Sequence, residues 1–128
     1  MCSSDLLWVA LGGGCGAVCR YLMSQVLGSA DWPLATAVCN LSGSFVIGLV
    51  AAVLLARPEA DPLVRPLAVT GFLGGFTTFS SFSLDNLRLL QSGRLWEAAA
   101  YAAGSVLLGL FLVFAGYKAG MALFCRGV

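Results

Sequence analysis

The stretch Thr70–Phe82, TGFLGGFTTFSSF, holds the residue types best suited to binding an ion in this sequence. Its glycines each destabilise a helix interior by about 1 kcal/mol relative to alanine, and its hydroxyl side chains offer the backbone competing hydrogen bonds. Because the stretch lies in an apolar segment, the backbone groups freed by a break would be costly in lipid unless they had a use. The pattern therefore predicts a discontinuous membrane helix, interrupted at Gly74–Thr78, at a functional site.

A break of this kind exposes backbone groups that bind ions. Carbonyls of an unwound segment coordinate cations, and the N-terminus of a half-helix attracts anions. Phe79 and Phe82 lie three residues apart beside the break, and the edge of an aromatic ring carries partial positive charge that can face an anion. These features indicate a membrane ion pathway or transporter site, but they leave the identity of the ion open.

Polar residues also occur inside other apolar segments. Thr36, Asn40 and Ser44 recur every fourth residue, a spacing that puts them on one face of a helix. At that depth Asn40 either faces a water-filled cavity or makes an interhelical hydrogen bond. Arg20 lies late in the first apolar segment, so it either reaches the membrane interface as an anchor or lies at a pore mouth.

The composition identifies the class of protein. Of 128 residues, 59% are hydrophobic and only 10% are charged, whereas about a quarter are charged in typical soluble domains. We therefore predict an integral membrane protein forming one domain, residues 1–128. The net charge of +1 gives no basic footprint for nucleic acid. The sequence has no histidine, no GxSxG motif and no intramembrane pair of carboxylates, so we do not expect an enzyme.

The fold class predicted is an all-α membrane protein with four transmembrane helices. The third would be broken into halves of roughly a dozen residues, and since a crossing takes about 20 residues, the two halves must cross together. Arg57–Arg65 contains two prolines and four charges, which predicts a loop, and Gln91–Leu95 predicts a tight turn. The four predicted spans are Leu6–Leu27, Leu34–Leu55, Leu63–Leu90 and Trp96–Phe124.

Positive charge is almost balanced between the two sides of the membrane. With four spans, four basic residues lie on the side of the termini and three on the other. The positive-inside rule needs a bias to set orientation, so we predict insertion in both orientations and an antiparallel homodimer with a two-fold interface. The residues counted are Arg57, Arg65, Lys118 and Arg126 on one side, and Arg20, Arg88 and Arg94 on the other.

Three motifs along the chain together resemble the fluoride channel family called CrcB or Fluc. They are GGGCGAVCRY, which ends near Arg20, TAVCNLSGSFVIGL around Asn40, and GFLGGFTTFSSFS in the third span. The resemblance implies a dual-topology antiparallel homodimer with two parallel fluoride pores. It also implies a multi-pass protein of the bacterial inner membrane that exports fluoride passively and so confers fluoride resistance.

The resemblance also implies roles for individual residues. Phe79 and Phe82 match the phenylalanines whose ring edges line the pores, and Asn40 matches the asparagine that donates to the ion. Tyr101 and Ser105 match a polar track on the fourth span.

Further roles implied by the resemblance concern the break and the pore mouth. Gly74 and Thr77 match the positions whose backbone carbonyls hold a central sodium ion, which is structural rather than conducted. Arg20 matches an arginine near the aqueous vestibule. Three positions depart from the family pattern: Gly109 replaces a hydroxyl residue of the track, Asp85 replaces a longer glutamate, and Ala35 replaces a common glycine.

Two other classes remain as alternatives. A small dual-topology transporter of another ion or a drug also has four short spans, but a drug exporter of that kind would carry a glutamate in its first span, and Leu6–Leu27 contains none. A purely structural membrane subunit would need no broken helix. The expected partners are therefore fluoride, a second copy of the chain and membrane lipid.

Overall fold

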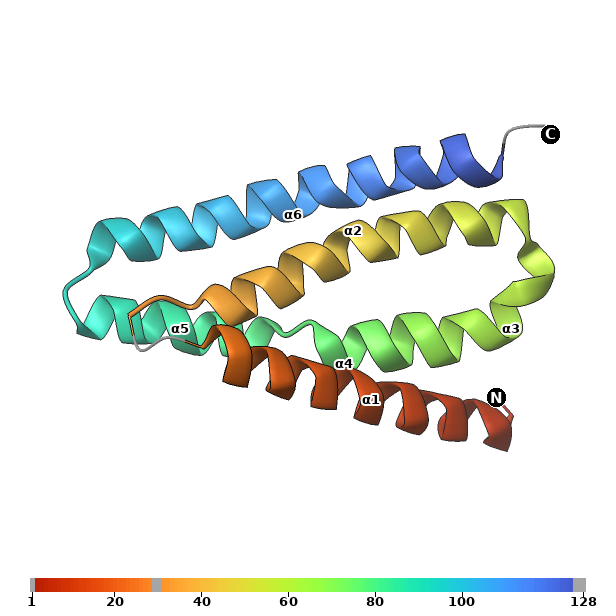
Figure 1. Ribbon diagram of the computed structural model, residues 1–128, viewed down its shortest axis with the longest axis horizontal. Coiled ribbons are helices and arrows are strands. Elements are labelled where there is room, and N and C mark those ends of the chain that lie inside the picture. The colour runs from red at the N-terminus through yellow and green to blue at the C-terminus, as the bar shows by residue number, and fades with distance from the viewer. Residues whose placement is uncertain (1, 29–30, 126–128) are drawn as a thin grey trace.

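The computed structural model describes residues 2–28 and 31–125, and this part of the chain is helical apart from short connections (Figure 1). It contains four helical segments long and apolar enough to cross a membrane, over residues 3–27, 34–56, 58–91 and 95–124. Arg126, counted in the charge balance, lies outside the described residues. The elements are α1 (Ser3–Leu27), α2 (Leu34–Ala56), η1 (Pro58–Ala60), α3 (Asp61–Val64), η2 (Arg65–Leu73), α4 (Gly74–Phe76), α5 (Phe79–Gln91) and α6 (Leu95–Phe124).

The prediction of a loop over Arg57–Arg65 is wrong. The chain turns at Arg57 and is helical again from Pro58, first as the 3₁₀ segment η1 and then as α3. Pro58 and Pro62 lie in the first turns of these segments, where the missing N–H would have had no helical partner. Asp61 and Arg65 form an ion pair one turn apart, with an N–O distance of 2.8 Å. The prolines and charges therefore begin the third membrane segment.

The helices pack through glycine-lined contacts in two pairs. In Figure 1, α2 runs beside α6, and α1 runs beside the segment η2–α4. A Cβ atom at Gly12 would overlap the carbonyl oxygen of Leu67, and one at Gly16 would overlap that of Phe72. Close approach of backbones explains the GxxxG pair in α1, since small residues drive helix association in lipid.

Gly16 allows a direct test of this packing. We expect Gly16→Ala to lower the thermal unfolding temperature in detergent markedly, because its Cβ atom would meet rigid backbone rather than a movable side chain. Gly14→Ala is the matched control: no atom lies within 4 Å of its added Cβ, so it should be neutral or slightly stabilising. Equal unfolding temperatures for the two variants would contradict this packing of α1.

The third membrane segment is interrupted at Thr77 and Thr78, inside the predicted stretch Gly74–Thr78. Both threonines have extended backbone angles, with φ and ψ of −86° and 154° for Thr77 and −154° and 121° for Thr78. Gly74 and Gly75 remain helical. Gly75 instead allows close packing, because a Cβ atom there would overlap the carbonyl oxygen of Gly13. The hydroxyl residues, rather than the glycines, thus form the break.

Candidate ion site at the helix break

Asn40 of α2 holds the break through two hydrogen bonds to one residue. Its Nδ2 donates to the Thr78 carbonyl at 3.0 Å, and its Oδ1 accepts from the Thr78 N–H at 2.7 Å. The side-chain amide thereby takes the place of the backbone partners that a continuous helix would give Thr78. The structure shows an interhelical hydrogen bond at Asn40 and also places this residue in the lining of a cleft, so both alternatives that the sequence left open remain. Only one of its two Nδ2 hydrogens is used by this bond.

The carbonyls of Gly74 and Thr77 are among the four that lose their helical donors at the break, since the last carbonyls before a helix end have no partner within the helix. In a continuous α-helix the Thr78 N–H would donate to Gly74, and the Ser81 N–H to Thr77. Here the Thr78 N–H donates to Asn40, and the Ser81 N–H donates to Thr78 Oγ1 at 3.1 Å. The carbonyls left without these donors belong to the two residues implied as sodium ligands. Asn40, Gly74, Thr77, Thr78 and Phe79 line one open cleft of about 380 Å³.

Arg20 reaches the opposite side of the same break. Its Nε donates to the carbonyl of Gly75 at 3.1 Å, from a half-buried position near the end of α1. It also lines a cleft of about 460 Å³ together with Thr36, Ser81, Asp85 and Arg88. The structure therefore places Arg20 beside a polar opening that ends at the break, rather than as an isolated interface anchor.

Aromatic rings continue from the break towards the turn between α5 and α6. The ring centroids of Phe79 and Phe82 are 5.7 Å apart, and those of Phe82 and Tyr101 are 5.1 Å apart. Tyr101 also contacts Trp32 in a T-shaped pair at 5.6 Å. Phe79 is 79% exposed, whereas Tyr101 is 3% exposed. The structure thus brings Phe79, Phe82 and Tyr101 into one row that leads from the exposed break to a buried position.

The remaining polar candidates lie along the contact between α2 and α6. Ser44 Oγ donates to the Asn40 carbonyl at 2.8 Å. Ser105 is half-buried one turn after Tyr101 and makes no hydrogen bond through its side chain within the described residues. Gly109 faces Ser44, whose Oγ would lie 3.5 Å from a Cβ at position 109. Gly109 has no hydroxyl of its own, but the Ser44 hydroxyl of α2 lies next to this position.

Comparison with known proteins identifies the family. The family model described as CrcB-like protein, Camphor Resistance (CrcB), matches residues 7–117. The chain belongs to the CrcB family. This membership confirms the resemblance drawn from the three motifs.

Several CrcB relatives carry the name fluoride-specific ion channel FluC. The protein from Stutzerimonas stutzeri is 50% identical over 112 residues, which cover 84% of this chain and 90% of the relative. The protein from Francisella tularensis subsp. mediasiatica is 48% identical over 118 residues, covering 88% and 91%. The protein from Bordetella petrii is 44% identical over 119 residues, covering 93% of each chain.

A polar cluster that was not predicted from the sequence of this CrcB chain lies at one end of the row of rings. Trp32 Nε1 donates to Glu97 Oε2 at 3.2 Å. Arg94 donates to Glu97, with Nε 3.0 Å from Oε1, and also to the backbone carbonyl of Asp31. The hydrogen bond to Glu97 raises the pKa of Arg94, so its guanidinium remains charged. Glu97 lies four residues before Tyr101 on α6, a spacing that was the available signal for a shared face.

Proposed function

We propose that this chain is a fluoride-selective channel that lets fluoride leave the bacterial cytoplasm passively across the inner membrane. The observation that carries the proposal is the name shared by relatives at 44–50% identity, fluoride-specific ion channel FluC, over most of each chain. The break at Thr77–Thr78 and the row of rings that begins there agree with an ion path.

Fluoride is small and strongly hydrated, so a path through the membrane must replace its water in steps. The positive edges of Phe79 and Phe82 supply weak, uncharged contacts. The remaining Nδ2 hydrogen of Asn40, the Tyr101 hydroxyl and the Ser105 hydroxyl supply donors. Contacts of this strength allow the ion to enter and also to leave.

The assembly we propose is an antiparallel homodimer with two pores. The seven basic residues of the sequence divide almost evenly between the two sides, four on the side of the termini and three on the other. Large apolar side chains remain exposed on the single chain, among them Val46, Ile47 and Leu55. Such a surface suits lipid or a second copy.

A structural sodium ion at the two-fold axis completes the proposal. Carbonyl oxygens of an unwound segment are suitable ligands for this cation. Those of Gly74 and Thr77 fit the role, because the N–H groups that would occupy them in a helix donate elsewhere. The ion would fix the two breaks relative to each other by neutralising the partial charge of these carbonyls.

The test is fluoride efflux from liposomes that contain the purified protein, followed with a fluoride electrode. A potassium gradient with valinomycin supplies the driving force, and chloride efflux is the control. Rapid loss of fluoride with retention of chloride is the expected result. A folded dimeric sample that moves no fluoride would contradict the proposed function, and the break would then serve another ion.

A further inference from the structure

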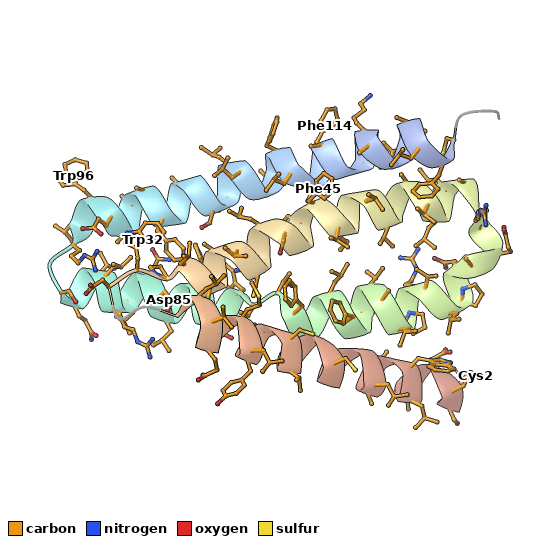
Figure 2. All side chains as sticks on the ribbon, in the orientation of Figure 1. Cys2, Trp32, Phe45, Asp85, Trp96 and Phe114 are labelled. Carbon is orange, nitrogen blue, oxygen red and sulfur yellow. The ribbon has the colours of Figure 1, made fainter. Side chains whose placement is uncertain are left out.

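The linker residue Trp32 is attached to two successive turns of α6. Its indole N–H donates to Glu97 at 3.2 Å, and its ring meets Tyr101, four residues later, edge to face. Figure 2 shows Trp32 between α5 and α6, whereas the neighbouring Trp96 points away from the bundle and is 90% exposed. Trp32 therefore has a specific position in this end of the molecule, unlike an interfacial tryptophan that only meets headgroups.

Arg94 secures the same linker a second time. It donates to Glu97 and, from the turn between α5 and α6, to the backbone carbonyl of Asp31. The carboxylate of Glu97 thus accepts hydrogen bonds from both Trp32 and Arg94, and charged hydrogen bonds are the stronger kind. Pro33 follows Trp32 directly and restricts its backbone to extended conformations, so the linker has little freedom once these contacts form.

The Tyr101 hydroxyl is hydrogen-bonded to Thr36 of α2, whereas its contact with α5 is weak. The distance from this hydroxyl to Asp85 Oδ2 is 3.5 Å, at the long limit of a hydrogen bond. Its ring lies between Trp32 on one side and Phe82 on the other. The indole is therefore one of the contacts that orient Tyr101, and with it the contact to Phe82, beside the bond to Thr36.

Trp32 and residues near it line two openings. Trp32, Pro33, Asp85 and Arg88 line both the cleft of about 460 Å³ and a smaller one of about 100 Å³. A displaced Trp32 would join these openings and change the surroundings of the Tyr101 hydroxyl.

We propose that Trp32, Glu97 and Arg94 form a clasp that positions Tyr101, and through it Phe82, at the mouth of the ion path. This inference rests on the proposed function, because it assigns positioning residues to that path. None of the three needs to touch the ion. The clasp acts by holding the linker before α2 against the first turns of α6.

The first test compares fluoride efflux from liposomes for Glu97→Ala, Glu97→Gln and Trp32→Phe. We expect Glu97→Ala to lower the flux about tenfold, an effect of the size that loss of a hydrogen bond to a charged group produces. Glu97→Gln keeps an oxygen acceptor for the indole and should restore most of the flux. Trp32→Phe keeps a ring but loses the donor, so it should resemble Glu97→Ala.

Two comparisons make the test specific. Glu59→Ala removes an exposed acidic side chain at the other end of the chain and should leave the flux unchanged. Glu97→Ala in the Trp32→Phe background should lower the flux less than Glu97→Ala does alone, because the indole hydrogen bond is already lost there and only the contact with Arg94 remains to be removed. Additive losses, or full flux in Glu97→Ala, would overturn the clasp.

The second test measures whether the clasp forms, independently of transport. In a Trp8→Phe and Trp96→Phe background, Trp32 is the remaining tryptophan, and its fluorescence reports its position. Glu97→Ala should increase quenching of Trp32 by acrylamide, and Glu97→Gln should increase it less. If the unaltered protein moves no fluoride, the proposed function fails, and quenching still decides whether the clasp exists. Unchanged quenching in Glu97→Ala would overturn it.

Discussion

Replacing Phe82 by isoleucine should lower fluoride flux about a hundredfold or more, equivalent to roughly 2.7 kcal/mol in the barrier. Phe82 lies at the centre of the row of rings, 5.7 Å from Phe79 and 5.1 Å from Tyr101. Isoleucine fills much of the same space but has no ring edge with partial positive charge. Phe79→Ile should act in the same direction. Fluoride efflux from liposomes, at equal amounts of reconstituted protein, gives the comparison.

Phe111→Ile is the matched control for this prediction. Phe111 lies on α6 and is 64% exposed on the single chain, and none of the ring contacts of the row involves it. Size-exclusion chromatography should give the same elution volume for all variants, that of the proposed dimer. Flux close to that of the unaltered protein from well-folded Phe82→Ile would refute an electrostatic role for the Phe82 ring edge.

Asn40→Ala should both destabilise the protein and abolish most of the flux. Loss of the amide leaves the N–H and the carbonyl of Thr78 without their present partners. An unsatisfied backbone group costs about 1–3 kcal/mol when it is fully buried, and the half-buried groups of Thr78 should cost less than that. A relaxed break would also move the Gly74 and Thr77 carbonyls. Thermal unfolding in detergent and fluoride efflux together measure the two effects.

Two further variants separate bracing from direct contact with the ion. Asn40→Asp can still accept from the Thr78 N–H but cannot donate to its carbonyl, and it adds a negative charge in the path. It should therefore retain more stability than Asn40→Ala and still conduct poorly. Ser42→Ala changes a neighbouring exposed residue whose hydroxyl bonds within α2 and should be neutral. An unfolding temperature unaffected by Asn40→Ala would rule out that Asn40 stabilises the break.

The proposed sodium site shares the geometry of the break. Gly74 and Thr77 line one open cleft with Asn40 and Thr78, so the arrangement of the break and the proposed cation site are coupled through Thr78. We therefore regard Asn40 as the residue whose loss affects ring positions, backbone carbonyls and stability together.

Much of the fold could be predicted from the sequence. The four membrane segments and the place of the break follow from hydropathy and from the glycine and hydroxyl residues of Thr70–Phe82. The boundary at Arg57–Arg65 was wrong because prolines were taken as loop residues, although they are tolerated in the first turn of a helix. The sequence could not show which small residues of the third segment pack against another helix and which interrupt the segment, because that depends on the position of α1.

The sequence by itself determined that this is a membrane protein with an interrupted third helix. Lipid offers the backbone no hydrogen-bond partners, so membrane spans must be apolar and helical, and a break in one can be recognised from its residue types. Only the tertiary structure decided what holds the break and the rings. Asn40 and Thr78 are 38 residues apart, and Trp32 and Glu97 are 65 apart. The periodicity of a helix relates only residues a few positions apart and cannot pair such distant residues. Packing of α2 and α6 against the third segment brings them within hydrogen-bond distance.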